Sequence, residues 1–117
     1  GLKMHEVSLA ESIVSALLEM QEKQSWKSVV EVRLRIGALR QVFPEILAFA
    51  FNTVTAGTPL EGARLVVEDV PLSFRCIDCG TPWNEDAALC PSCGSMHRET
   101  VAGMELDIES VEVEEQS

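Results

Sequence analysis

Two short segments, CIDCG at residues 76–80 and CPSCG at residues 90–94, decide how the middle of this chain folds. Each contains two cysteines separated by two residues and followed by a glycine, and ten residues separate the two pairs. A C-x2-C turn places two thiolates on one side of a tight bend, and the glycine relieves the strain of that bend. Two facing turns form a closed tetrahedral cage of sulfur atoms, which suits a structural Zn2+. The predicted zinc ligands are Cys76, Cys79, Cys90 and Cys93.

The same cysteines have two other conceivable uses, a redox dithiol or a pair of disulfides. Disulfides need an oxidising compartment, which nothing in the sequence suggests. A thioredoxin-like site has one C-x2-C at the start of a helix, whereas this chain has two, each inside a glycine-bounded turn. His97 lies four residues beyond Cys93 and is either a surface residue or a replacement ligand for a dissociated thiolate. We expect the surface role.

The first part of the chain has the periodicity of a helix followed by a strand. Residues 8–11, SLAE, have the form of a capping box, so we expect a helix over 8–23. The apolar positions expected on its buried face are Leu9, Ile13, Leu17 and Met20. The period then changes to two, which predicts a strand over 28–36 that ends at Gly37. The residues expected on its buried face are Val30, Val32, Leu34 and Ile36.

A second helix and two further strands complete the expected main fold. Pro44 suits the first position of a helix, which we predict over 44–56. A valine-rich strand is predicted over 63–70. The last strand is predicted over 104–113, with a bulge where the alternation changes phase at Ser110.

These elements indicate an α+β fold, in which two helices pack on one small three-stranded sheet and a four-cysteine zinc-ribbon module is inserted. We expect residues 4–71 together with 99–114 to form one α/β domain. Residues 72–98 contain little apolar material, so we expect them to form a separate zinc-binding domain held by the metal.

The composition limits the kinds of partner. The 117 residues carry a formal net charge of -10, which argues against nucleic acid because binding to phosphate needs clustered Lys and Arg. No apolar run approaches the length of a membrane span, and the start of the chain lacks a secretory signal, so we expect a cytoplasmic protein without a membrane partner. Residues 1–3, GLK, precede a methionine and fit no pattern, and we expect Met4 to be the natural start.

The segment Met4-His5-Glu6 is a candidate site for a second metal. In a chain that begins at Met4, the free amine, the amide nitrogen of His5 and the His5 imidazole can close fused chelate rings on one ion. Nitrogen donors in a plane suit Ni2+ or Cu2+, whereas Zn2+ gains nothing from planarity. Taken alone, a histidine near the start of a chain is more often a surface residue.

Eight segments in this order and spacing carry a resemblance to a known family. They are MHE at 4–6, SLA at 8–10, RIGAL at 35–39, PE at 44–45, FAF at 49–51, the two cysteine pairs, and ELDIESVEV at 105–113. Together they resemble the HypA/HybF family of nickel metallochaperones, over nearly all of residues 4–114.

The resemblance implies a protein that supplies nickel to the precursor of the large subunit of [NiFe]-hydrogenase, and in some organisms also to urease maturation proteins, with a nickel-binding GTPase as partner. It implies that His5 and the adjoining backbone of Met4 anchor the nickel, and that Glu6 is a neighbouring ligand or an orienting group. It also implies that the four cysteines bind zinc and that the sheet is mixed. Such a protein is not an enzyme.

The chain departs from the family at one place, and one other function stays open. Some relatives carry a carboxylate in the loop before the second helix, whereas residues 40–43 here read RQVF, so we expect no nickel ligand from that loop. The alternative function is a zinc-ribbon protein-interaction module without metal transport. Catalysis is disfavoured because the chain has only two histidines and a four-sulfur site lacks an open coordination position.

Overall fold

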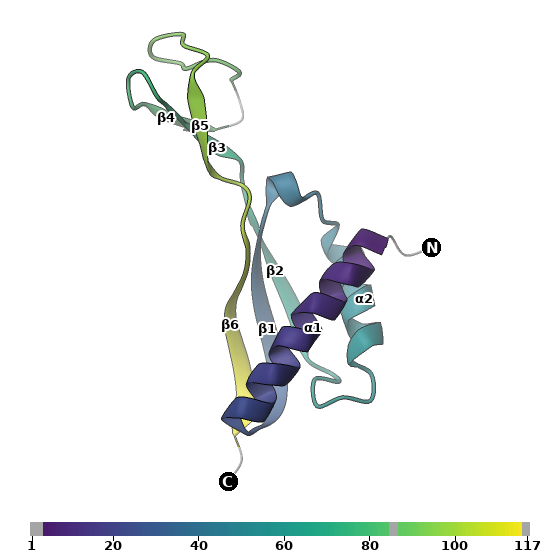
Figure 1. Cartoon of the computed structure of the whole chain (residues 1–117). Helices are drawn as coiled ribbons and strands as arrows, with labels where there is room; N and C mark the ends of the chain where they lie inside the picture. Colours follow the sequence, from purple (N-terminus) through teal and green to yellow (C-terminus); the bar gives the residue numbers. More distant parts are fainter. Residues whose placement is uncertain (1–3, 85–86, 116–117) are drawn as a thin grey trace. The chain divides into compact units, whose positions relative to one another are not determined.

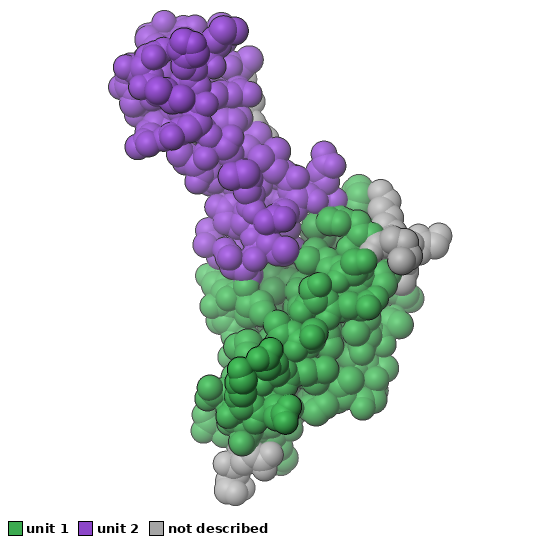
Figure 2. Space-filling view, viewed as in Figure 1, with its two compact units in different colours: residues 1–34, 42–67, 108–117 green, residues 35–41, 68–107 purple. Residues whose placement is uncertain are grey.

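The computed structural model describes residues 4–84 and 87–115. The elements of this range are α1 (Met4–Gln24), β1 (Trp26–Gly37), the short 3-10 helix η1 (Ala38–Arg40), α2 (Pro44–Thr55), β2 (Arg64–Val70), β3 (Ser73–Cys76), β4 (Pro82–Asn84), β5 (Arg98–Ala102) and β6 (Leu106–Glu115). The described residues divide into two compact units, which Figure 2 distinguishes by colour: residues 4–34, 42–67 and 108–115 form the first, and residues 35–41, 68–84 and 87–107 the second. Neither described helix is long and apolar enough to cross a membrane.

The first unit is built on a three-stranded sheet with both α-helices on one face (Figure 1). Strand β1 lies in the centre, between β2 and β6. Strands β1 and β2 run in the same direction and β6 runs in the opposite direction, so the sheet is mixed. Helices α1 and α2 also pack against each other. The predicted α+β fold is therefore confirmed.

Helix α1 begins at Met4 within the described residues, so the predicted start at Ser8 is wrong. The reason is that the buried face of the helix continues for one more turn: Glu6 is buried one turn before the buried Ala10. Packing of this turn outweighs the local capping signal. At the other end of the helix, Met20 is exposed rather than buried, so the apolar face is shorter than predicted.

Strand β1 follows the predicted alternation except at its start. The buried side chains of β1 are Val29, Val32, Leu34 and Ile36. Val30 is 41% exposed, so its predicted place on the buried face is wrong. Two residues rather than one separate the buried Val29 and Val32, and one extra residue in a strand shifts the alternation to the other face.

The other predicted elements of this unit agree with the structure. Helix α2 and strands β2 and β6 begin and end within two residues of the predicted positions. Pro44 occupies the start of α2. In β6 the half-buried positions change parity between Ile108 and Val111, which confirms the phase change predicted at Ser110.

The second unit contains a smaller sheet with the strand order β4-β3-β5, which the sequence does not predict. Both pairings are antiparallel, with Phe74 opposite Trp83 and Cys76 opposite Arg98. The rings of Phe74 and Trp83 lie 5.6 Å apart between centroids, and they form a small core with Cys76 and Cys90. A core of this size is too small to hold a module without a further staple.

A backbone ladder in the second unit joins the end of β1 to the segment after β5. The N–H of Gly37 donates to the carbonyl of Glu105 at 2.8 Å, and the N–H of Leu39 donates to the carbonyl of Gly103 at 2.8 Å. A Cβ added to Gly37 would lie 2.1 Å from the carbonyl carbon of Gly103. Glycine at position 37 therefore allows the two backbones to approach, and β1 ends there as predicted.

Candidate metal centres

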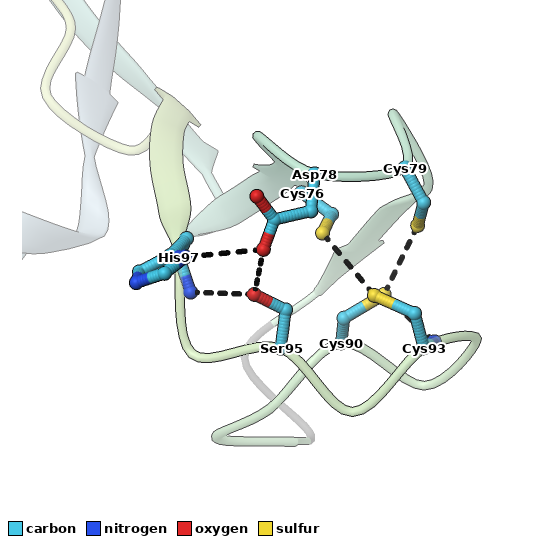
Figure 3. A network of polar contacts seen from close by, with 7 residues as sticks. All are labelled: Cys76, Asp78, Cys79, Cys90, Cys93, Ser95 and His97. Atoms are coloured by element: carbon cyan, nitrogen blue, oxygen red, sulfur yellow. Dashed lines mark hydrogen bonds and ion pairs between the residues drawn. The ribbon is translucent and has the colours of Figure 1, made fainter.

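The four cysteines come together within the second unit (Figure 3). Their sulfur atoms all lie within 4.8 Å of one another. The Sγ atoms of Cys76 and Cys93 are 3.6 Å apart, and those of Cys79 and Cys90 are 3.5 Å apart. In each pair of the sequence the first cysteine is buried and the second is exposed. The predicted assembly of these residues into one cluster is confirmed.

The two cysteine turns have the same backbone structure. In each, the N–H of the closing glycine donates to the carbonyl of the first cysteine at 2.9 Å. Gly80 and Gly94 adopt φ angles of +79° and +75°, in the left-handed region that glycine enters without steric strain. The N–H of the first cysteine donates to a carbonyl five residues later, that of Thr81 in one turn and Ser95 in the other. Both turns thus aim their thiols at the same point.

The thiols of this cluster differ in pKa. The hydroxyl of Thr81 lies 3.2 Å from the sulfur of Cys79, and hydrogen bonds from Thr81 lower the pKa of Cys79 to about 6. The N–H of Ser95 favours the thiolate of Cys93, but the neighbouring thiols of Cys76, Cys79 and Cys90, together with partial desolvation, outweigh it and raise the pKa of Cys93 to about 12. Crowded sulfur atoms cannot all ionise together unless a cation compensates their charge. A divalent metal would supply that charge and displace the remaining protons.

The geometry of the cluster fits zinc. A tetrahedral ion with Zn–S bonds of about 2.3 Å places its sulfur ligands roughly 3.8 Å apart. The two measured sulfur separations, 3.5 and 3.6 Å, are close to this value. All four cysteines are free, so the structure does not have the paired-disulfide arrangement. Four protein ligands complete the tetrahedron and leave no position for a substrate.

A polar network beside the sulfur atoms links the two turns (Figure 3). One oxygen of Asp78 accepts a hydrogen bond from the hydroxyl of Ser95 and lies 3.1 Å from Nδ1 of His97. The N–H of His97 donates to the Ser95 hydroxyl at 3.0 Å. Hydrogen bonds from Ser95 and His97 lower the pKa of Asp78. The ring of His97 is thus exposed and paired with Asp78, as expected for a surface residue of the turn.

The candidate nickel residues lie on the first turn of α1 rather than ahead of the helix. The side chain of His5 is exposed, whereas Glu6 is buried. The N–H of Phe43 donates to Oε2 of Glu6 at 3.4 Å. Oε1 of Glu6 is buried and has no hydrogen-bond partner among the described residues. Sequence reasoning missed this contact with Phe43, because no local pattern marks it.

The fold and the sulfur cage define a small α+β metal-binding protein with an inserted four-thiol module. The profile of the family described as "Hydrogenase/urease nickel incorporation, metallochaperone, hypA" matches residues 4–113. The chain belongs to this HypA family, as its sequence resemblance predicts. The family is described as a metallochaperone family, and the relatives are named hydrogenase maturation factors.

Individual relatives are similar along their whole length. The chain is 42% identical over 113 residues to the hydrogenase maturation factor HypA of Methylocella silvestris, covering 95% of this chain and 100% of that relative. It is 35% identical to the corresponding factor of Aquifex aeolicus, covering 95% and 98%. A solution structure of the Ni metallochaperone HypA from Helicobacter pylori has a TM-score of 0.68 at 22% identity, covering 95% of this chain and 98% of that chain. At that identity the structural likeness shows the fold alone.

Proposed function

We propose that this protein carries Ni2+ at its Met4-His5-Glu6 segment and delivers it for the maturation of [NiFe]-hydrogenase. Membership of a nickel-incorporation family, with relatives named hydrogenase maturation factors, supports this class of function. The observation that carries the site is the exposed side chain of His5 on the first turn of α1. An ion held there is open to an acceptor protein, as a cargo must be.

The backbone of this turn supplies nitrogen ligands in addition to the imidazole. Within a helix each N–H donates to the carbonyl four residues earlier, and α1 begins at Met4, so the amide of His5 has no acceptor inside the helix. In a chain beginning at Met4, the free amine, this amide nitrogen and Nδ1 of His5 can enclose one ion in two fused chelate rings. Such a planar set of nitrogen donors favours Ni2+ or Cu2+ over Zn2+.

Two effects keep an ion at this place exchangeable. The N-terminus of α1 is the positive end of its helix dipole, which opposes a cation by about 0.3–1 kcal/mol. Protons also compete with the metal for the nitrogen atoms of the amine, the amide and the imidazole. Binding that is opposed in these ways suits transfer better than storage.

The zinc cage has a different role in this proposal. Because its four ligands are all protein sulfur atoms, it accepts no substrate, and it serves to hold the shape of the second unit. The recipient of the nickel is the precursor of the hydrogenase large subunit, and in some organisms a urease maturation protein. A nickel-binding GTPase acts with the carrier.

Nickel titration of matched proteins tests the proposal. We expect a chain beginning at Met4 to bind one Ni2+, with the visible absorption of planar nitrogen coordination, and to lose this binding in the His5→Ala variant. The chain with residues 1–3 should bind more weakly, since those residues convert the amine of Met4 into an amide. His97→Ala is the control, because the ring of His97 pairs with Asp78.

An unchanged nickel affinity after His5→Ala would refute the assigned anchor. Stoichiometric zinc binding without any nickel binding in the chain beginning at Met4 would refute the carrier function altogether. The result would then favour a zinc-ribbon interaction module, for which the sulfur cage alone is sufficient.

A further inference from the structure

Glu6 is the one buried acidic residue in the part of the chain that the structure describes. Its side chain is 1% exposed, although His5 directly before it is exposed. Glutamate is rarely buried unless it is paired, because removing a carboxylate from water is costly. Glu6 is in addition left with one buried oxygen, Oε1, that has no partner among the described residues. A residue that disfavours folding in this way is a candidate for a role in function.

The other oxygen of Glu6 acts at the start of the second helix. Its partner is the N–H of Phe43, the residue immediately before α2, at 3.4 Å. Phe43 has no side chain that can cap the helix, and Pro44 follows it at the first helical position. Glu6 therefore provides from α1 the acceptor for the N-cap N–H that a Glu or Gln at position 46 would provide in a capping box, and it lies near the positive end of α2.

The position of Glu6 on the helix separates it from the imidazole. Consecutive residues of an α-helix point about 100° apart around its axis. The side chain of His5 lies on the exposed side of α1, whereas that of Glu6 lies on the side that packs toward α2. The carboxylate of Glu6 is thus held at the start of α2, on a different side of α1 from the exposed side chain of His5.

We infer that Glu6 is a positioning residue and not a ligand of the nickel, an inference that rests on the proposed function. Its contact with the N–H of Phe43 holds the first turn of α1 against the start of α2. The same contact fixes the backbone of Met4 and His5, which supplies two of the nitrogen ligands. The affinity for nickel then depends on the hydrogen bond between Phe43 and Glu6, in which none of the nickel ligands takes part.

Two pairs of variants in the chain beginning at Met4 test this inference. Glu6→Gln keeps an oxygen that can accept from Phe43, whereas Glu6→Ala does not. Phe43→Pro removes the N–H, and proline is tolerated there because the φ of Phe43, -91°, is near the range of proline. Phe43→Ala removes the ring and keeps the N–H. The exposed Glu11→Ala, on the same helix, is the control for loss of an acidic side chain. Each variant is titrated with Ni2+, and its visible absorption and thermal unfolding are recorded.

We expect Glu6→Ala and Phe43→Pro to weaken nickel binding by a similar factor, on the order of fivefold, as the loss of a helix cap implies. Their nickel absorption should match that of the unaltered chain, because the ligand atoms are unchanged. Glu6→Gln, Phe43→Ala and Glu11→Ala should bind within about twofold of it. If Glu6→Gln keeps the nickel affinity that Glu6→Ala loses, the hydrogen bond to Phe43 and not the negative charge of Glu6 supports nickel binding.

Two results would overturn the inference. Loss of binding in Glu6→Gln as complete as in His5→Ala, with a changed absorption, would make Glu6 a ligand. Equal affinity in Glu6→Ala, Phe43→Pro and the unaltered chain would leave it without influence on the metal. Failure of the proposed function is distinct from both, because the unaltered chain would then bind no nickel.

Discussion

Replacing Gly37 with alanine tests the backbone ladder between the end of β1 and residues 103–105. Gly37 has a φ of -76° and a ψ of 151°, an extended conformation that alanine adopts without strain. From backbone freedom alone, Gly37→Ala would stabilise the protein by about 0.4–1 kcal/mol, because it restricts the unfolded chain. The structure predicts the opposite sign, since the new Cβ would lie 2.1 Å from both carbonyl atoms of Gly103.

The size of the effect follows from what must move. The three atoms nearest to this Cβ are all backbone atoms, including the nitrogen of Met104 at 2.5 Å, so the clash cannot be relieved by rotation of a side chain. Separating the two segments breaks the hydrogen bonds from Gly37 to Glu105 and from Leu39 to Gly103. Two backbone hydrogen bonds contribute about 1–3 kcal/mol, and residual overpacking adds about 1 kcal/mol or more. We expect Gly37→Ala to lower the free energy of unfolding by about 2–4 kcal/mol.

Urea unfolding of the zinc-loaded protein, followed by tryptophan fluorescence, measures this change. Gly62→Ala is the matched control: Gly62 has a φ of +84° and open space around its Cβ position, so this variant reports backbone strain without a clash. We expect it to cost about 1–2 kcal/mol. If Gly37→Ala were neutral or stabilising, the close approach of Gly37 to Gly103 would not exist in solution.

Two further predictions concern zinc and acid. Removing zinc with a chelator should shift the emission of Trp83 to the red in a variant without Trp26, because the core that Trp83 shares with Phe74 needs the metal; unchanged emission would contradict this. The N–H of Gly103, which donates to Glu105 at 2.7 Å, is the largest cause that lowers the pKa of Glu105 below its ordinary 4.5. The ionised carboxylate therefore stabilises the fold above pH 4.5, and this stabilisation is lost as the pH falls through the lowered pKa. The difference in Tm between the wild type and Glu105→Gln should consequently decrease in acid. A difference independent of pH would count against it.

The four-cysteine cluster was predictable because the geometry of each turn is local. The backbone hydrogen bonds that close each turn, such as that from the N–H of Gly80 to the carbonyl of Cys76, join residues at most five positions apart. The polar network was not predictable, because Asp78 and Ser95 are 17 residues apart and meet only after the turns face each other. Strands β3 to β5 are too short for their alternation to stand out from the surrounding loops.

The start of α1 illustrates the other limit of sequence patterns. The capping box at Ser8 is a sound local signal, yet the helix extends to Met4 because Glu6 meets Phe43, which is 37 residues away in the sequence. The prediction for Val30 in β1 was wrong for another reason, since alternation gives the two faces of a strand but not where the alternation changes phase.

The extra turn of α1 changes how the proposed nickel site would work. In a segment ahead of the helix, binding would have to order the backbone of Met4 and His5, at about 1–2 kcal/mol for each residue. On the first turn of α1, folding has already ordered them, and the helix dipole is the opposing term that remains, at about 0.3–1 kcal/mol. While the turn stays folded, the ordering cost that is avoided therefore exceeds the penalty from the helix dipole. Since Glu6 contacts the start of α2, a partner that displaces this contact would weaken nickel binding, on the order of fivefold, without competing for any of the ligands of the ion.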